Sequence, residues 1–133
     1  MKPIGPDHTP FDRLGAEGAR ALAARFYDHM DANEPALVSL HRMDESKTKV
    51  APGVREAFAL FLVEWLGGPN EYSAKHGHPR LRMRHAHVAV DASMRDAWLR
   101  CMTAALAHES VDEEVRVYLG RRFAEVADFL RNR

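Results

Sequence analysis

Residues 52–69 read Pro-Gly-Val-Arg-Glu-Ala-Phe-Ala-Leu-Phe-Leu-Val-Glu-Trp-Leu-Gly-Gly-Pro, and this stretch decides the fold class. Its large apolar side chains recur at helical spacing and form one stripe, which consists of Val54, Phe58, Phe61, Leu62 and Trp65. The Gly-Gly-Pro at its end predicts a stop, because glycine tolerates a positive φ and proline cannot continue the helical hydrogen bonds. We therefore expect an amphipathic helix from about Pro52 to Leu66.

The region before this stretch predicts two more helices. Apolar residues four apart indicate a long helix from Gly18 to about residue 30, and Tyr27 lies beside its buried stripe. That stripe consists of Leu22, Phe26 and Met30. A shorter helix is expected from Pro35 towards His41, because proline is well tolerated in a first turn.

The region after it predicts a short helix and two long ones. Residues 70–77 indicate a loop with about one helical turn, and His78-Pro79 can open a short helix that runs to His85. Asp91 is a candidate N-cap for a helix whose stripe is Met94, Trp98, Cys101, Met102 and Ala105. Residues 110–113, Ser-Val-Asp-Glu, have the form of a capping box before a last helix with Val115, Leu119, Phe123, Val126 and Leu130. No segment alternates with period two, so the expected class is all-α.

Length and composition predict a single globular domain. A chain of 133 residues with 46% hydrophobic and 29% charged residues can bury one continuous core. Its 19 Lys and Arg residues balance 19 Asp and Glu residues, so neither nucleic acid nor a membrane surface is an expected partner. The lone Cys101 cannot form an internal disulfide, and no apolar run suits a signal peptide or a membrane span, which favours the cytoplasm.

Eight histidines are the chemically unusual feature of the sequence, and four of them form the close pairs His76/His78 and His85/His87. Such pairs allow a zinc site, since imidazole is a common zinc ligand. The signal is weak, because zinc sites usually need three or four ligands and no Cys-x-x-Cys accompanies these histidines. Solvated surface histidines explain the pairs as well.

His85 gives a stronger signal through its neighbours. Leu81 lies one turn earlier on the same predicted face, whereas Arg82 and Arg84 point elsewhere. A haem site needs this combination: a neutral imidazole for the iron, an apolar slot for the macrocycle and cations for the propionates. For an isolated histidine, a partly buried side chain bonded to a backbone carbonyl remains the ordinary alternative.

Three stretches of the chain closely resemble the group II truncated haemoglobins: residues 67–72, residues 77–85 and residues 95–102. Arg25-Phe26-Tyr27 in the first long helix matches as well, and the resemblance covers the chain from about Phe11 to Leu130. It implies a two-over-two helical sandwich around haem b. Residues 1–10 would then be an N-terminal extension, and residues 11–133 the globin domain.

The resemblance also implies roles for single residues. His85 matches the proximal iron ligand, Tyr27 the distal tyrosine and Trp98 the tryptophan whose indole N–H faces the bound ligand. His41 stands where many members carry tyrosine, so we expect it to contact the ligand and regard it as a candidate second iron ligand. Val54 stands where other globins place a distal histidine and cannot donate a hydrogen bond.

The remaining expected haem contacts are pocket-wall residues. Tyr72 and Arg84 match positions that contact the propionates in the family, although a solvated arginine explains Arg84 nearly as well. His87 stands where relatives often have proline, and we interpret it as solvated. The predicted wall comprises Val54, Phe58, Phe61, Trp65, Tyr72, Leu81, Arg84 and Met102.

Three functions follow from this sequence. The first is reversible binding of dioxygen and other diatomic ligands such as nitric oxide, with slow release caused by polar groups from Tyr27, His41 and Trp98. The second is a redox enzyme, either a haem peroxidase or a nitric oxide dioxygenase served by a separate reductase. The third is a helical interaction module without a cofactor, and a homodimer is a candidate assembly for any of them.

Overall fold

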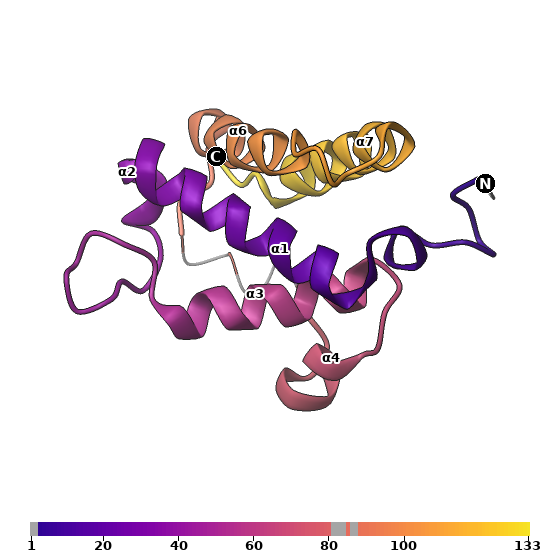
Figure 1. Cartoon of the computed structure of the whole chain (residues 1–133). Helices are drawn as coiled ribbons and strands as arrows, with labels where there is room; N and C mark the ends of the chain where they lie inside the picture. The colour runs from indigo at the N-terminus through magenta and orange to yellow at the C-terminus, as the bar shows by residue number, and fades with distance from the viewer. Residues whose placement is uncertain (1–2, 81–84, 86–87) are drawn as a thin grey trace.

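The computed structural model describes residues 3–80, 85 and 88–133, and these form two layers of helices (Figure 1). The described helices are α1 (Pro10–Asn33), α2 (Pro35–Val38), α3 (Pro52–Trp65), α4 (Glu71–His76), α6 (Ala92–Leu106) and α7 (Glu113–Leu130). Within these residues there is no strand, only isolated bridges between Gly5 and His8 and between Met43 and Val50. The all-α prediction is confirmed.

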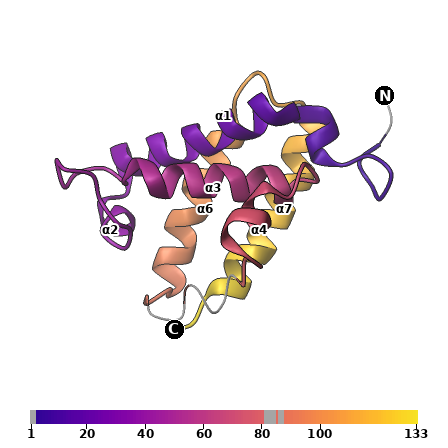
Figure 2. The same ribbon diagram turned by 90° about the horizontal axis from the view of Figure 1, so that it is seen from below.

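The long helices form two pairs that cross each other. Figure 2 shows α1 and α3 running side by side across α6 and α7, and α1 packs most extensively against α3 and α6. This is the two-over-two arrangement expected from the resemblance. None of the described helices has the length and apolar character needed to cross a bilayer.

The start of α1 differs from the prediction, which placed it at Gly18. The helix begins at Pro10, because Thr9 caps it by accepting a hydrogen bond from the Asp12 N–H, and the Asp12 side chain accepts one from the Thr9 N–H in return. Gly15 breaks the helix with φ 71° and ψ 175°. Apolar periodicity detected only the part of α1 beyond this break.

Two other predicted helix starts are wrong. The N-cap of α7 is Asp112 rather than Ser110: the Asp112 carboxylate accepts from the Val115 N–H at 3.0 Å, whereas the Ser110 hydroxyl lies 2.7 Å from His108 Nδ1. Residues 78–80 are not helical, and Arg80 has a φ of 44°. Of the short helix predicted from residue 78 to 85, residues 81–84 lie outside the described part of the chain.

The Gly67-Gly68 pair ends α3 as predicted, and Gly67 has a φ of 111°. A Cβ atom at Gly67 would lie 2.6 Å from the Cβ of Thr9, so only glycine allows this close approach. The Phe11 N–H donates to the Leu66 carbonyl at 3.0 Å. The turn therefore sets the start of α1 against the end of α3.

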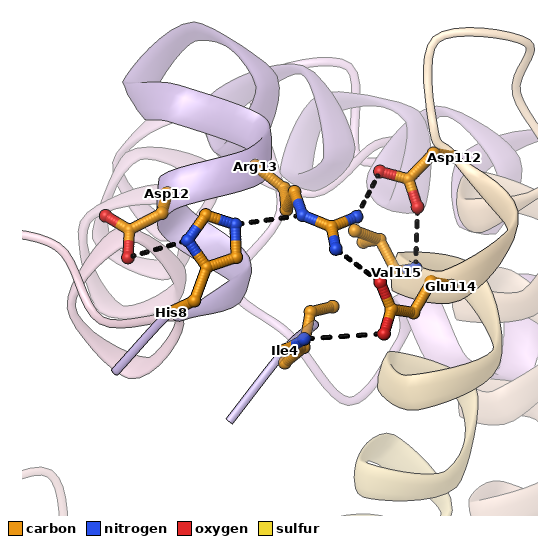
Figure 3. Close-up of polar contacts among 7 residues, drawn as sticks. All are labelled: Ile4, His8, Asp12, Arg13, Asp112, Glu114 and Val115. Carbon is orange, nitrogen blue, oxygen red and sulfur yellow. Dashed lines mark hydrogen bonds and ion pairs between the residues drawn. The ribbon is translucent and has the colours of Figure 1, made fainter. Parts of the chain in front are cut away.

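Arg13 ties the N-terminal segment to the first turn of α7 (Figure 3). The Arg13 side chain is 6% exposed, and its guanidinium bonds Asp112 at 3.1 Å and forms an ion pair with Glu114. Arg13 Nε also donates to His8 Nε2 at 2.9 Å, and the Ile4 N–H donates to the Glu114 carboxylate. These contacts hold α1, the segment before it and α7 together at one end of the molecule.

Candidate functional site

An apolar cavity of about 330 Å³ lies between α3 and the C-terminal end of α7. Helices α1, α2, α4 and α6 complete its wall, together with Leu40 and His41 after α2 and with His85, Val88 and Val90. The lining residues are Tyr27, Leu37, Leu40, His41, Val54, Ala57, Phe58, Phe61, Tyr72, His85, Val88, Val90, Met94, Arg95, Trp98, Val126, Ala127 and Leu130. Eight of the predicted site residues are therefore brought together at one cavity: Tyr27, His41, Val54, Phe58, Phe61, Tyr72, His85 and Trp98.

Helix α3 supplies the cavity wall because it is apolar on two faces. Leu62 and Ala59 are buried in the protein core, with 0% and 6% exposure. Phe58 and Phe61 are only half-buried and line the cavity instead. One face of α3 thus belongs to the core and the other to the site.

His41 and His85 face the same cavity, and both are half-buried. Burial lowers the pKa of His41; the hydrogen bond to the Leu37 backbone opposes this shift, and the nearby His85 adds to it. His41 is therefore neutral at neutral pH.

The hydrogen bond from His41 determines which ring nitrogen carries the proton. Nδ1 lies 2.8 Å from the Leu37 carbonyl oxygen, which can only accept, so Nδ1 donates. In the neutral ring, Nε2 then holds a lone pair. Neutral His41 can accept a hydrogen bond or bind a metal through Nε2, but Nε2 has no proton to donate to a ligand.

Tyr27 is fixed at the cavity by rings and a cation. It is 4% exposed, and its ring packs edge-on against Phe26 at 5.0 Å and Phe58 at 5.5 Å between centroids. The Arg55 guanidinium lies 5.7 Å from its ring centroid and bonds Asp28 at 2.7 Å. Burial raises the pKa of Tyr27, so the phenol keeps its proton and can donate it.

Trp98 lines the cavity from α6. Its ring packs edge-on against Phe26 at 5.3 Å and against Phe123 at 5.8 Å between centroids. Phe123 also stacks on Trp65, with the ring centroids 4.9 Å apart. Trp65, predicted as a haem contact, therefore packs between α3 and α7 and does not line the cavity.

The other predicted wall residues have different positions. Tyr72 lines the cavity from α4, with its ring 5.6 Å from Phe61. Met102 is 1% exposed, belongs to the core and does not line the cavity. Leu81 and Arg84 lie outside the described residues.

Sequence reasoning did not single out several lining residues. Met94, Val126 and Leu130 were placed on helical stripes, but periodicity does not separate a core face from a cavity wall. Arg95 was missed as a site residue; it lines the cavity one turn before Trp98 and bonds Asp128 at 3.0 Å. The complete set of missed residues is Leu37, Leu40, Ala57, Val88, Val90, Met94, Arg95, Val126, Ala127 and Leu130.

The zinc alternative finds no support in the described part of the chain, where no three His, Cys, Asp or Glu side chains converge on one point. The His76 ring lies 4.8 Å from that of Tyr72, and His78 Nδ1 accepts from the Arg80 N–H at 3.1 Å. His87 lies outside the described residues.

Comparison with known proteins identifies the family. A model of the bacterial-like globin family matches residues 9–132. The group 2 truncated hemoglobin of Bacillus subtilis is 32% identical over 125 residues, which cover 94% of this chain and 89% of that protein. This chain belongs to the group II truncated haemoglobins. It is therefore a haem-binding globin.

Solved structures of truncated haemoglobins have the same fold. The cold-adapted truncated hemoglobin of Pseudoalteromonas haloplanktis superposes with a TM-score of 0.85 at 38% identity and covers 94% of this chain and 98% of its own. The truncated oxygen-avid haemoglobin of Bacillus subtilis superposes with a TM-score of 0.82 at 31% identity and covers 94% and 100%.

The residues of this truncated haemoglobin fit a haem. The cavity volume of about 330 Å³ falls in the range of small-molecule sites, and most of its lining side chains are apolar. His85 offers an imidazole for the iron, and Arg95 and Tyr72 add polar groups at the wall. A haem needs apolar side chains around its ring, an imidazole for its iron and polar groups for its propionates.

We expect His41 in the haem-free protein to titrate below the ordinary histidine pKa of about 6.5, with Nδ1 protonated in the neutral ring. The unfolded chain takes up the proton more readily than the folded protein does. The free energy of unfolding that depends on neutral His41 is therefore fully present when the pH lies above the unfolded pKa of about 6.5. It is lost as the pH falls through the unfolded pKa towards the folded one. Long-range ¹H–¹⁵N NMR of the ring and urea unfolding between about pH 7 and pH 5 measure both effects.

Replacing His41 with glutamine should reduce this loss of stability on acidification. Replacing the exposed His108, whose ring bonds Ser110, with glutamine should leave the loss of stability on acidification unchanged. A neutral His41 ring protonated at Nε2 would contradict the assigned hydrogen bond.

Proposed function

We propose that this truncated haemoglobin binds haem b through His85 and reversibly binds dioxygen and other diatomic ligands, which it releases slowly. The haem supplies the reversible binding of the diatomic molecule. The observation that carries the proposal is the convergence of His85, Tyr27, His41 and Trp98 on one apolar cavity.

Two donors from the chain favour slow release. The Tyr27 hydroxyl and the Trp98 indole N–H belong to side chains that line the cavity, and both are held by aromatic packing. Dioxygen held at a haem would carry partial negative charge, and a hydrogen bond to a charged group contributes about 1.5–3 kcal/mol. The relative from Bacillus subtilis described as oxygen-avid supports the same interpretation.

Replacing His85 with alanine should remove the bound pigment, because no other imidazole is expected to take its place on the proximal side. The absorption spectrum and haem content of the purified protein measure this. Added imidazole should restore part of the haem spectrum. Replacing His29, whose ring nitrogen Nδ1 bonds the Asn33 side chain on α1, with alanine should leave the wild-type haem spectrum intact. Unchanged pigment in the His85→Ala variant would refute the assignment.

Replacing both Tyr27 and Trp98 with phenylalanine should speed dioxygen dissociation by at least about a hundredfold, since two donors of about 1.5 kcal/mol or more are lost. Stopped-flow displacement of dioxygen by carbon monoxide measures the rate. Tyr118→Phe is the matched control, because Tyr118 packs against the core from α7 and does not line the cavity. Equal rates in the double variant and the wild type would rule out this account of the distal side.

We further propose that His41 binds the iron through Nε2 when no external ligand is present. The hydrogen bond from Nδ1 to the Leu37 carbonyl supports this, because it leaves the Nε2 lone pair available. The reduced wild-type protein should then show a six-coordinate low-spin spectrum. His41→Ala should convert it to a five-coordinate one, and Tyr27→Phe should not. A five-coordinate reduced wild type would contradict this ligation.

A further inference from the structure

Asn132 connects the end of α7 with His85, Val88 and Val90. It lies two residues beyond Leu130, and its backbone N–H donates to the Val90 carbonyl at 2.8 Å. Its side-chain Oδ1 accepts from the Val90 N–H at 2.9 Å. Its Nδ2 donates to the Val88 carbonyl at 2.9 Å and, at 3.4 Å, to the carbonyl of His85 itself.

These contacts reach three residues that line the cavity, although Asn132 does not line it. Residues 88–91 are not helical; the Val88 N–H donates locally to the His85 carbonyl at 3.1 Å, whereas both backbone groups of Val90 find their partners on Asn132. Asn132 satisfies both backbone groups of Val90 and the carbonyl of Val88. The positions of Val88 and Val90 therefore depend on one residue that lies beyond the end of α7.

The support behind Asn132 is fixed at the same end of the molecule. Val126 and Leu130 of α7 line the cavity, and Asp128 on the same helix bonds Arg95 of α6 at 3.0 Å. The hydrogen bonds of Asn132 therefore link this end of α7 to His85, Val88 and Val90.

We propose that Asn132 is a positioning residue for the imidazole of His85. By holding the carbonyls of His85 and Val88 and both backbone groups of Val90, it sets how the imidazole approaches the iron. Hydrogen bonds to the ring of a metal-binding histidine typically change metal affinity by about 10–100-fold, and the Asn132 bonds act on the same imidazole through its backbone. This inference rests on the role of His85 proposed above.

Two variants separate the parts of the contact. Asn132→Ala removes all three side-chain bonds and keeps the backbone bond to Val90. Asn132→Asp keeps an acceptor for the Val90 N–H but loses the donor to the carbonyls of Val88 and His85. Arg131→Ala is the matched control, because the Arg131 side chain bonds the Arg133 carbonyl nearby.

Resonance Raman spectroscopy measures the iron–histidine stretching band, and a His41→Ala background keeps the haem five-coordinate for this measurement. In that background the band should shift and broaden in Asn132→Ala and Asn132→Asp. Haem transfer to apomyoglobin should be about tenfold faster in Asn132→Ala. Arg131→Ala should match the parent protein in both measurements. An unchanged band and transfer rate in both Asn132 variants would overturn the inference.

Hydrogen exchange in the haem-free protein separates this inference from the proposed function. The Val90 amide should be protected in the wild type and exchange at least about tenfold faster in Asn132→Ala. Faster exchange with an unchanged iron–histidine band would mean that Asn132 only docks the end of the chain, which overturns the positioning role. A wild-type protein that takes up no haem would instead overturn the proposed function, and the inference with it.

Discussion

The rest of the site depends on one apolar face of α3. The protein's own core does not cover this face, so it stays partly exposed at the cavity. Val54, Phe58 and Phe61 stay half-buried at the cavity while Leu62 is fully buried on the other side of the helix. Removing apolar surface from water contributes about 25 cal/mol per Å². A flat apolar cofactor that covers this face therefore stabilises the fold, and folding and cofactor binding are linked.

Contacts with neighbouring residues set the protonation of the polar groups at the cavity. The Leu37 carbonyl determines which nitrogen of His41 is protonated, and burial keeps the phenol of Tyr27 protonated. The two rings lie 6.0 Å apart between centroids and are nearly perpendicular. The lone pair of neutral His41 and the hydroxyl proton of Tyr27 therefore belong to neighbouring rings at one corner of the cavity.

The sequence predicted the long helices well because each carries an apolar stripe, and it failed where local backbone chemistry decides. The break at Gly15 hid the start of α1, and the carboxylate of Asp112 caps α7 in place of Ser110, which bonds His108. These outcomes depend on φ angles and on competition between nearby side chains, which periodicity does not report.

The site shows the same division. The family resemblance pointed to His85, Tyr27 and Trp98, which the structure places at one cavity. It also proposed Trp65 and Met102, which do not line that cavity: half-buried Trp65 stacks on Phe123, and Met102 is buried in the core. A helical stripe does not say whether it faces the core or a ligand. Asn132 gave no signal, because its importance arises only when the end of the chain meets residues more than forty positions earlier.

Helix α7 is held at both of its ends. At the start of α7, Arg13 bonds Asp112 and Glu114. Just beyond the last turn of α7, Asn132 bonds Val90. Sliding of this helix along its own axis would break one set of bonds or the other. The cavity wall that α7 provides therefore keeps its register against its neighbours when a molecule enters the cavity.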